Sequence, residues 1–290
     1  MGSLPRMDEN NSGGNAEQAR YWAEDGGPNW VRDEVAYDLM LTPFNLALID
    51  ALDPQPGERV LDVGCGFGST ALAAAARGAE VHGVDISPPM IERARERAAD
   101  VTANATFEVG DAQEDSLGGP YDAVTSRFGV MFFADPVRAF RNFAIATRPH
   151  GRLAFVCWQA LERNPWMIAA PKVLRSLMED PPPPPPLGSG PFAFGESAFV
   201  DQVLADAGWT QRSIAPFETS TRMGGNDGVQ GAVKQALSNS AARALLALGD
   251  ATLRDRAAAI LTDQFESLSV DGVVTFPAAA WLVTARRDER

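Results

Sequence analysis

The chain has 290 residues, of which 45% are apolar, and a formal net charge of −13 at pH 7. This size and composition predict one globular domain that carries insertions. The acidic balance argues against a nucleic acid partner, because phosphate binding needs a basic face. No window of about 18 uninterrupted apolar residues is present, so no membrane partner is expected. The N-terminus lacks an apolar signal-peptide core, which predicts a cytoplasmic protein.

The first 52 residues divide into a tail and two helices. Residues 1–15 are polar and rich in glycine and asparagine, which predicts a disordered tail. Helical periodicity then predicts one helix from Ala16 to Ala23 and a second from Asp33 to Ala51. Gly26-Gly27-Pro28 is expected to break the chain between them, because glycine and proline both disfavour a helix interior.

An apolar strand near residues 59–63 leads into a glycine-rich loop, Asp62-Val63-Gly64-Cys65-Gly66-Phe67-Gly68-Ser69. Glycines at this spacing allow a sharp turn and a close approach of the backbone to a ligand. The helix expected over 69–77 would direct its free N–H groups and the positive end of its dipole at that ligand. The loop therefore predicts a site for a nucleotide-like molecule.

Two further strands end near acidic residues. The strand near 80–84 leads to Asp85, whose carboxylate can accept both hydroxyls of a ribose through charge-assisted hydrogen bonds. The next strand leads to Gly110-Asp111-Ala112. Alternating strands and helices predict βαβ units in a parallel sheet, with ligands at the carboxyl edge. The remaining expected elements are strands near 105–109, 121–126 and 151–158 and helices near 88–99 and 137–147.

The alternation changes after residue 159. Residues 159–195 contain an expected helix over 166–179 and the run Pro181 to Pro186, which predicts an extended surface connector. A helix over 196–207 and a strand over 209–217 follow, and residues 228–268 return to helical spacing. The final strand, 273–286, is expected at a sheet edge because it contains Pro277. We interpret 159–195 and 221–270 as insertions that cap the pocket of a single domain spanning 16–290.

The spacing Asp62-x-Gly64-x-Gly66-x-Gly68 resembles motif I of the class I S-adenosylmethionine-dependent methyltransferases. Gly110-Asp111-Ala112, the segment from Tyr121 to Phe133 and the turn Arg148-Pro149-His150-Gly151 resemble later elements of that family in order, with His150 in place of the usual glycine. The resemblance covers residues 16–160 closely. The segment with Tyr21, Trp22 and Trp30 is similar to the N-terminal helices that close over the cofactor in the ubiquinone- and menaquinone-biosynthesis-like small-molecule methyltransferases. It implies a Rossmann-like α/β fold: a seven-stranded, mostly parallel sheet with an antiparallel last strand, helices on both faces and helical cap insertions.

The resemblance also implies S-adenosylmethionine as the cofactor. Asp62 would act on the methionine ammonium through the loop, with a purely structural role as the alternative. Met90 and the aromatic residues of the N-terminal helices have core packing as their alternative. The residues expected to bind the cofactor are Tyr21, Trp22, Trp30, Asp62, Gly64, Cys65, Gly66, Gly68, Asp85, Ile86, Met90, Gly110, Asp111, Ala112, Ser126, Arg127 and Phe128.

Aromatic and apolar residues concentrate in the segments that should border an acceptor. They favour methyl transfer to a small apolar or aromatic metabolite, and they are Met131, Phe132, Trp158, Trp166, Phe192 and Phe194. His82 and His150 lie away from the expected reaction site, so no catalytic residue is predicted. Cys65 and Cys157 are expected to be buried thiols, and two cysteines with two histidines predict no metal site. The oligomeric state stays open, with a homodimer as one option.

Two alternative functions stay open. A catalytically silent cofactor-binding protein would keep the same glycine loop. A nicotinamide-dependent oxidoreductase would share the strand–turn–helix arrangement, but short-chain dehydrogenases need a Tyr-x-x-x-Lys pair. The residues four positions after Tyr21, Tyr37 and Tyr121 are aspartate, leucine and threonine, so the sequence contains no such pair.

Overall fold

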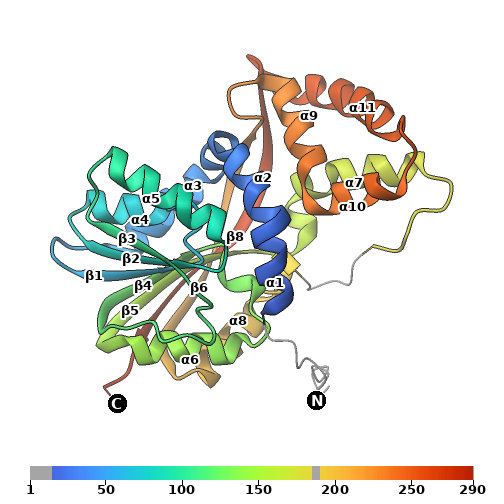
Figure 1. Cartoon of the computed structure of the whole chain (residues 1–290). Helices are drawn as coiled ribbons and strands as arrows, with labels where there is room; N and C mark the ends of the chain where they lie inside the picture. Colours follow the sequence, from blue (N-terminus) through green and yellow to red (C-terminus); the bar gives the residue numbers. More distant parts are fainter. Residues whose placement is uncertain (1–14, 185–189, 290) are drawn as a thin grey trace, which may run out of the picture.

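The computed structural model describes residues 15–184 and 190–289, and it is built around one twisted sheet (Figure 1). The strand order is β3-β2-β1-β4-β5-β8-β6, with a short strand, β7, paired to β8. The strands are β1 (Arg59–Val63), β2 (Glu80–Asp85), β3 (Ala105–Val109), β4 (Tyr121–Arg127), β5 (Thr147–Trp158), β6 (Trp209–Met223), β7 (Ser269–Val270) and β8 (Val273–Arg287).

The predicted topology is confirmed with two corrections. Strands β1 to β5 pair in parallel, and β8 pairs antiparallel to both β5 and β6. The two-residue β7 adds an eighth strand to the seven expected. In addition, β8 lies between β5 and β6 rather than at the edge. Pro277 fits in this interior strand because it pairs with Ser220 of β6 beyond Ala280, the last partner of β5.

Helices cover both faces of the sheet, as predicted (Figure 1). Helix α6 (Pro136–Ala146) begins where the Asp135 side chain accepts a hydrogen bond from the Arg138 N–H. Pro136 fits the first turn because its missing N–H would have no helical partner there. Helices α3 (Glu34–Leu52), α4 (Ser69–Ala76) and α5 (Pro88–Asp100) lie on one face, and α6 (Pro136–Ala146) and α8 (Ser197–Asp206) lie on the other.

Helix α3 is long and apolar enough to cross a membrane by length and composition. In the structure its side chains Phe44, Leu48 and Leu52 are completely buried, and it packs against β5, β6 and β8. Its apolar character is therefore explained by its place in the core.

The N-terminal helical segment runs through the expected break. Helix α1 (Ala16–Tyr21) continues into the π-helix η1 (Trp22–Gly26) and then α2 (Gly27–Arg32). The wider π turn and the small glycines explain the continuity, since a Cβ on Gly27 would lie 2.2 Å from the Trp22 carbonyl oxygen. Pro28 falls in the first turn of α2, where its missing N–H is tolerated.

The two expected insertions meet in one helical layer, which we call the cap. It consists of α7 (Pro165–Leu177), α9 (Gly228–Ser238), α10 (Ser240–Leu248) and α11 (Leu253–Leu268), and α7 packs against the other three helices. The cap and the N-terminal helical segment stand on the same side of the sheet (Figure 1). Part of the proline run, residues 185–189, lies outside the described residues.

Candidate functional site

A cavity of about 440 Å³ lies at the carboxyl ends of β1, β2 and β4, between the N-terminal helical segment and the cap. Its volume lies within the ordinary range of small-molecule sites, roughly 300–1,000 Å³. Of the residues predicted to bind a cofactor, fourteen line it: Tyr21, Trp22, Trp30, Gly64, Cys65, Gly66, Asp85, Ile86, Met90, Gly110, Asp111, Ala112, Arg127 and Phe128. Asp62, Gly68 and Ser126 are not in its lining.

The glycine loop forms the floor of this cavity. Gly64 has a φ of 62° and Gly68 a φ of 85°, a left-handed conformation that favours glycine. A Cβ on Gly64 would lie 2.9 Å from the Cα of Gly129, so the loop touches the turn that follows β4. The N–H groups of Gly64 and Cys65 donate to the Val84 carbonyl at 2.8 and 3.2 Å, which ties the loop to β2.

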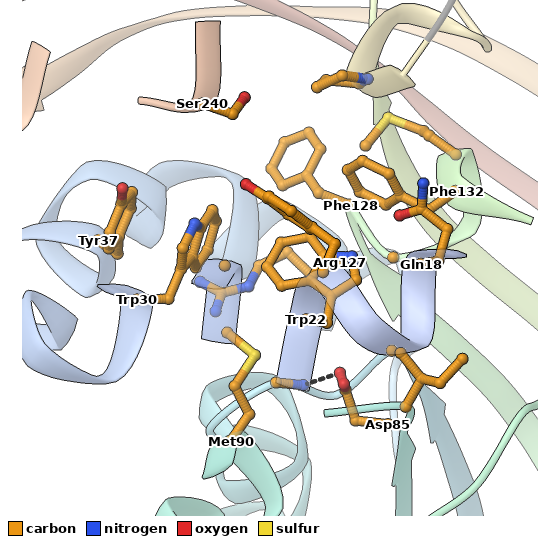
Figure 2. A pocket seen from close by; sticks show the side chains of 18 of the residues that line it. Gln18, Trp22, Trp30, Tyr37, Asp85, Met90, Arg127, Phe128, Phe132 and Ser240 are labelled. Atoms are coloured by element: carbon orange, nitrogen blue, oxygen red, sulfur yellow. Dashed lines mark hydrogen bonds between the residues drawn. The ribbon is translucent and has the colours of Figure 1, made fainter. Parts of the chain in front are cut away.

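Asp85 stands at the end of β2 and faces the loop. Its Oδ2 accepts a hydrogen bond from the Gly66 N–H at 2.8 Å, the contact drawn in Figure 2, and its Oδ1 accepts one from the Ser87 N–H at 2.9 Å. Burial raises the pKa of Asp85, and the two backbone donors oppose that shift. Each carboxylate oxygen has a further lone pair, so the group can still accept hydroxyls from a bound ribose.

Asp111 is held by a residue that we expected in a disordered tail. The amide of Asn15 donates to Asp111 Oδ1 at 2.8 Å and accepts from the Ala134 N–H at 2.9 Å. Asn15 is 5% exposed and lines the cavity, so the predicted tail ends before it. Residues 1–14 lie outside the described residues.

Asp62 lies beneath the loop rather than in the cavity. It is completely buried, and neither carboxylate oxygen has a hydrogen-bond partner among the described residues. Burial raises its pKa to about 7, and the Arg127 charge opposes that shift only in part. The hydroxyl of nearby Ser126 is also buried without a partner there. Unpaired buried polar atoms of this kind are costly, and they fit a polar ligand held above the loop.

Aromatic side chains form the opposite wall. Phe128 stacks on Trp158 with ring centroids 3.8 Å apart, and Trp166 meets Trp158 edge-on at 5.3 Å. Phe128 holds a φ of 61°, a strained conformation for a side chain of this size. Met131 and Phe132 also line the cavity, as predicted. Cys157, immediately before Trp158, is a buried free thiol, and so is Cys65, as expected.

Two of the predicted acceptor residues lie elsewhere. Phe194 is 2% exposed and packs against Phe140, Phe155 and Phe199 on the far face of the sheet. Phe192 is half-buried against the core and does not line the cavity. Both residues follow the proline run, and Gly190 and Pro191, immediately before Phe192, line the cavity in their place.

Sequence patterns did not reveal the polar side chains that the cap contributes. Gln235 of α9, Ser240 and Arg243 of α10, and Asn239 between the two helices line the cavity. The Arg243 guanidinium makes a bidentate ion pair with Asp25 of η1, with 2.7 Å between Nη2 and Oδ2, and its Nη2 is 3.5 Å from the Tyr21 hydroxyl. Tyr37 stacks on Trp30 at 4.0 Å and was also missed. The sequence signal for these residues was weak: polar side chains at intervals along segments with the apolar spacing of a helix.

Neither histidine lies in the cavity. His82 is half-buried within β2, with Nδ1 3.2 Å from the Thr106 hydroxyl, and burial lowers its pKa. His150 is exposed at the opposite edge of the sheet, 3.5 Å from Glu289. Within the described ranges no group of three potential metal ligands occurs.

Comparisons with known proteins agree with this geometry. Residues 60–151 match the family described as a methyltransferase domain. Aklanonic acid methyltransferase DauC of Streptomyces sp. (strain C5) is 39% identical over 39% of this chain and 54% of its own length. Demethylmenaquinone methyltransferase of Mycobacterium sp. (strain KMS) is 30% identical over 56% of this chain and 71% of its own length. For DauC, the matched segment thus spans only about half of the relative.

The fold extends further than the sequence similarity. Magnesium protoporphyrin IX methyltransferase ChlM from Synechocystis PCC 6803, crystallised with S-adenosylhomocysteine, superposes with a TM-score of 0.54 at 18% identity, covering 94% of this chain and 99% of that one. This likeness supports the fold alone. The glycine loop, the strand order and the sequence similarity to the Mycobacterium enzyme together show that the chain belongs to the class I S-adenosylmethionine-dependent methyltransferases.

Proposed function

We propose that this protein transfers the methyl group of S-adenosylmethionine to a small acceptor with an apolar or aromatic face. The observation that carries the proposal is the order of polar groups along the carboxyl edge of the sheet. Asp111 follows β3, Asp85 ends β2 and the glycine loop follows β1, on three neighbouring strands that line one cavity. A nucleoside joined to an amino acid offers matching groups in the same order.

In this proposal each part of the edge holds one part of the cofactor. Asp111 and Ala112 take the adenine edge, Asp85 accepts the ribose hydroxyls, and the backbone of Gly64 and Gly66 follows the methionine part. The unpartnered Asp62 carboxylate beneath the loop supplies negative charge on the side of the ammonium. When bound, the cofactor supplies an electrophilic methyl group on a positively charged sulfur.

The acceptor would lie against the aromatic wall formed by Phe128, Trp158 and Trp166. These rings exclude water and present flat apolar faces, which suits a planar acceptor. No side chain in the described part of the cavity is assigned as a general base. The protein's own contribution would then be alignment of the acceptor with the methyl group and desolvation beneath the cap.

The two alternatives make different predictions. A silent binding protein would keep the cofactor site and show no turnover. A nicotinamide oxidoreductase would bind NAD in place of S-adenosylmethionine. The aromatic wall favours an active enzyme over a protein that binds the cofactor without catalysis. A protein that only bound the cofactor would not need a second, apolar half of the cavity.

Thermal unfolding with two ligands tests the cofactor assignment. A ligand at about 100 times its dissociation constant stabilises the folded state by about 2.7 kcal/mol, which raises the melting temperature by roughly 5 °C in a chain of this size. S-adenosylhomocysteine should produce that shift and NAD should not. Equal shifts, or a shift with NAD alone, would overturn the assignment. Labelled-methyl transfer to a panel of aromatic metabolites then separates an enzyme from a silent binder.

A further inference from the structure

Arg127 is a buried cation in the wall of the cavity. It ends β4, its side chain is 9% exposed, and that side chain contributes to the cavity lining. Figure 2 shows it among the aromatic side chains that surround the pocket. Burial lowers the pKa of Arg127, because a guanidinium removed from water is disfavoured in its charged form. Such a group needs an anion close by.

The nearest acidic neighbour does not provide a close partner. Arg127 Nη2 lies 3.9 Å from Asp38 Oδ1, beyond hydrogen-bond distance. Both oxygens of Asp38 have shorter contacts: Oδ1 accepts from the Ser69 hydroxyl at 2.5 Å and Oδ2 from Arg97 at 2.7 Å. Across residues 15–184 and 190–289 we find no hydrogen bond from the Arg127 guanidinium to another group. Its donors are therefore free to meet a ligand.

The position of Arg127 indicates which ligand group it would meet. Strand β4 is the neighbour of β1 on the side away from β2 and β3, so Arg127 lies across the glycine loop from Asp85 and Asp111. The turn that follows Arg127 packs directly against the glycine loop, because a Cβ added to Gly64 would lie 2.9 Å from the Cα of Gly129. Neighbouring strands are about 4.8 Å apart, which puts Arg127 about 14 Å along the sheet from the strand that precedes Asp111. A ligand with its base at Asp111 would place its other end here.

We propose that Arg127 binds the aminoacyl carboxylate of the cofactor. The inference rests on the proposed function, because it requires S-adenosylmethionine as the cofactor. A planar guanidinium matches a carboxylate with two parallel N–H donors, an arrangement that lysine cannot reproduce. Arg127 is thus a binding residue for the end of the cofactor that carries no adenosine.

Two ligands that differ only in that end test the proposal. S-adenosylhomocysteine carries the amino-acid group, and 5′-methylthioadenosine lacks it. Calorimetry with the full-length chain would measure both affinities in wild type and in Arg127→Gln. We expect the variant to bind S-adenosylhomocysteine roughly 10- to 100-fold more weakly, the loss typical of a hydrogen-bonded charge. Methylthioadenosine affinity should change by less than about threefold. The affinity of Arg127→Lys for S-adenosylhomocysteine should lie between those of wild type and Arg127→Gln.

Arg97→Gln is the matched control. Arg97 donates to the same Asp38 and is also mostly buried, but it does not line the cavity. This variant should keep the ratio of the two affinities. An equal loss for both ligands in Arg127→Gln, or no loss for either, would overturn the proposal.

The carboxylate could instead belong to the acceptor, and a third ligand separates the two sources. With S-adenosylhomocysteine at saturation, 2-naphthoate is titrated as an aromatic carboxylate probe. Binding of naphthoate to wild type but not to Arg127→Gln, with S-adenosylhomocysteine affinity unchanged, would assign Arg127 to the acceptor and overturn our assignment. If wild type binds neither adenosyl ligand, the proposed function itself fails. If it binds both, the cofactor class stands whatever the Arg127 variant does.

Discussion

The two halves of the cavity are built in different ways. On the cofactor side, Gly64, Asp85 and Asp111 each lie at or just after the end of a parallel strand. Hydrogen bonds between neighbouring loops fix Gly64 and Asp85, and Asn15 is the one distant residue that holds Asp111 among the described contacts. On the cap side, the walls come from helices far apart in the sequence: the ion pair between Arg243 and Asp25 joins residues 218 positions apart. The cofactor side therefore depends on local geometry, whereas the cap side depends on tertiary packing.

This difference predicts that cofactor binding and methyl transfer to the acceptor can be damaged separately. Damage to the cap should abolish methyl transfer and spare cofactor binding, whereas damage to the loop should weaken cofactor binding and leave the acceptor wall intact.

Excision of the cap insertion should have the largest effect. Met223 of β6 pairs directly with Val274 of β8, so a short Asn-Gly turn can replace residues 225–272 and close the two strands as a hairpin. Turnover should fall more than roughly 10³-fold, because alignment and desolvation of the acceptor are lost. S-adenosylhomocysteine affinity, measured by calorimetry, should stay within about tenfold.

The control for this excision is secondary structure, since α7 loses its packing partners. Far-UV circular dichroism should show an intact sheet and the loss of the excised helices. Turnover within tenfold of wild type, or complete loss of cofactor binding in a folded variant, would contradict the separation of the two halves.

Replacement of Asp62 tests the electrostatic cost of the loop. Its folded pKa of about 7 lies above its unfolded value, so between about pH 4 and pH 7 the folded state binds more protons than the unfolded state. The wild-type free energy of unfolding should therefore fall as pH rises through this window. The side chain that Asp62→Asn introduces does not titrate. The free energy of unfolding of the variant minus that of wild type should therefore rise by on the order of 3 kcal/mol from pH 4 to 7.5.

Urea unfolding at several pH values measures this difference, and Asp201→Asn is the control. The pKa of Asp201 is lowered by its ion pair with Arg212, so that variant should change in the opposite direction. A pH-independent difference between Asp62→Asn and wild type would show that Asp62 is charged and stabilised in the folded protein.

The sequence predicted the sheet because its signals are local. Apolar runs ending at Asp85 and before Gly110 mark strand ends, and the order of the parallel strands follows from the family fold. Two of the errors arose where tertiary context overrides composition. The π turn at Trp22–Gly26 absorbs a Gly-Gly-Pro break, and β8 enters the sheet interior despite Pro277.

The site was predictable on one side only. The cofactor residues follow from spacing along the chain, and their roles stay predictions. Asn15 and Arg243 could not be identified because their partners, Asp111 and Asp25, lie 96 and 218 residues away in the sequence. Tyr37 could not be identified because Trp30, on which it stacks, lies on another helix. Phe194 shows the converse error, since an aromatic residue in a loop near the pocket proved to be core.

Asp85→Ala measures the cofactor side directly. Loss of a carboxylate that accepts charge-assisted hydrogen bonds should weaken S-adenosylhomocysteine binding by roughly 1.5–3 kcal/mol, or about 10- to 100-fold. Asp85→Asn keeps one acceptor oxygen and should lose less. Glu108→Gln is the control, because that side chain is 70% exposed on β3 and should leave affinity unchanged. Unchanged calorimetric affinity in a folded Asp85→Ala protein would remove Asp85 from the site.

The smallest effect is expected at the ion pair that joins the two helical walls. Asp25 is about half exposed and Arg243 a quarter exposed, so the pair should contribute no more than about 1 kcal/mol. Asp25→Asn should therefore speed hydrogen exchange of the η1 and α10 amides by up to roughly fivefold, through more frequent local opening. High salt should produce part of the same change in wild type, because it screens exposed charges.

A double-mutant cycle with Arg243→Gln would isolate the coupling between the two side chains. The exchange rates of β1 and β2 amides and the affinity for S-adenosylhomocysteine serve as internal controls, since both depend on the other half of the cavity. Faster exchange confined to η1 and α10 would support separate construction of the two halves. Faster exchange that extends into β1, or a matching loss of cofactor affinity, would show instead that the contact between Asp25 and Arg243 holds both halves together.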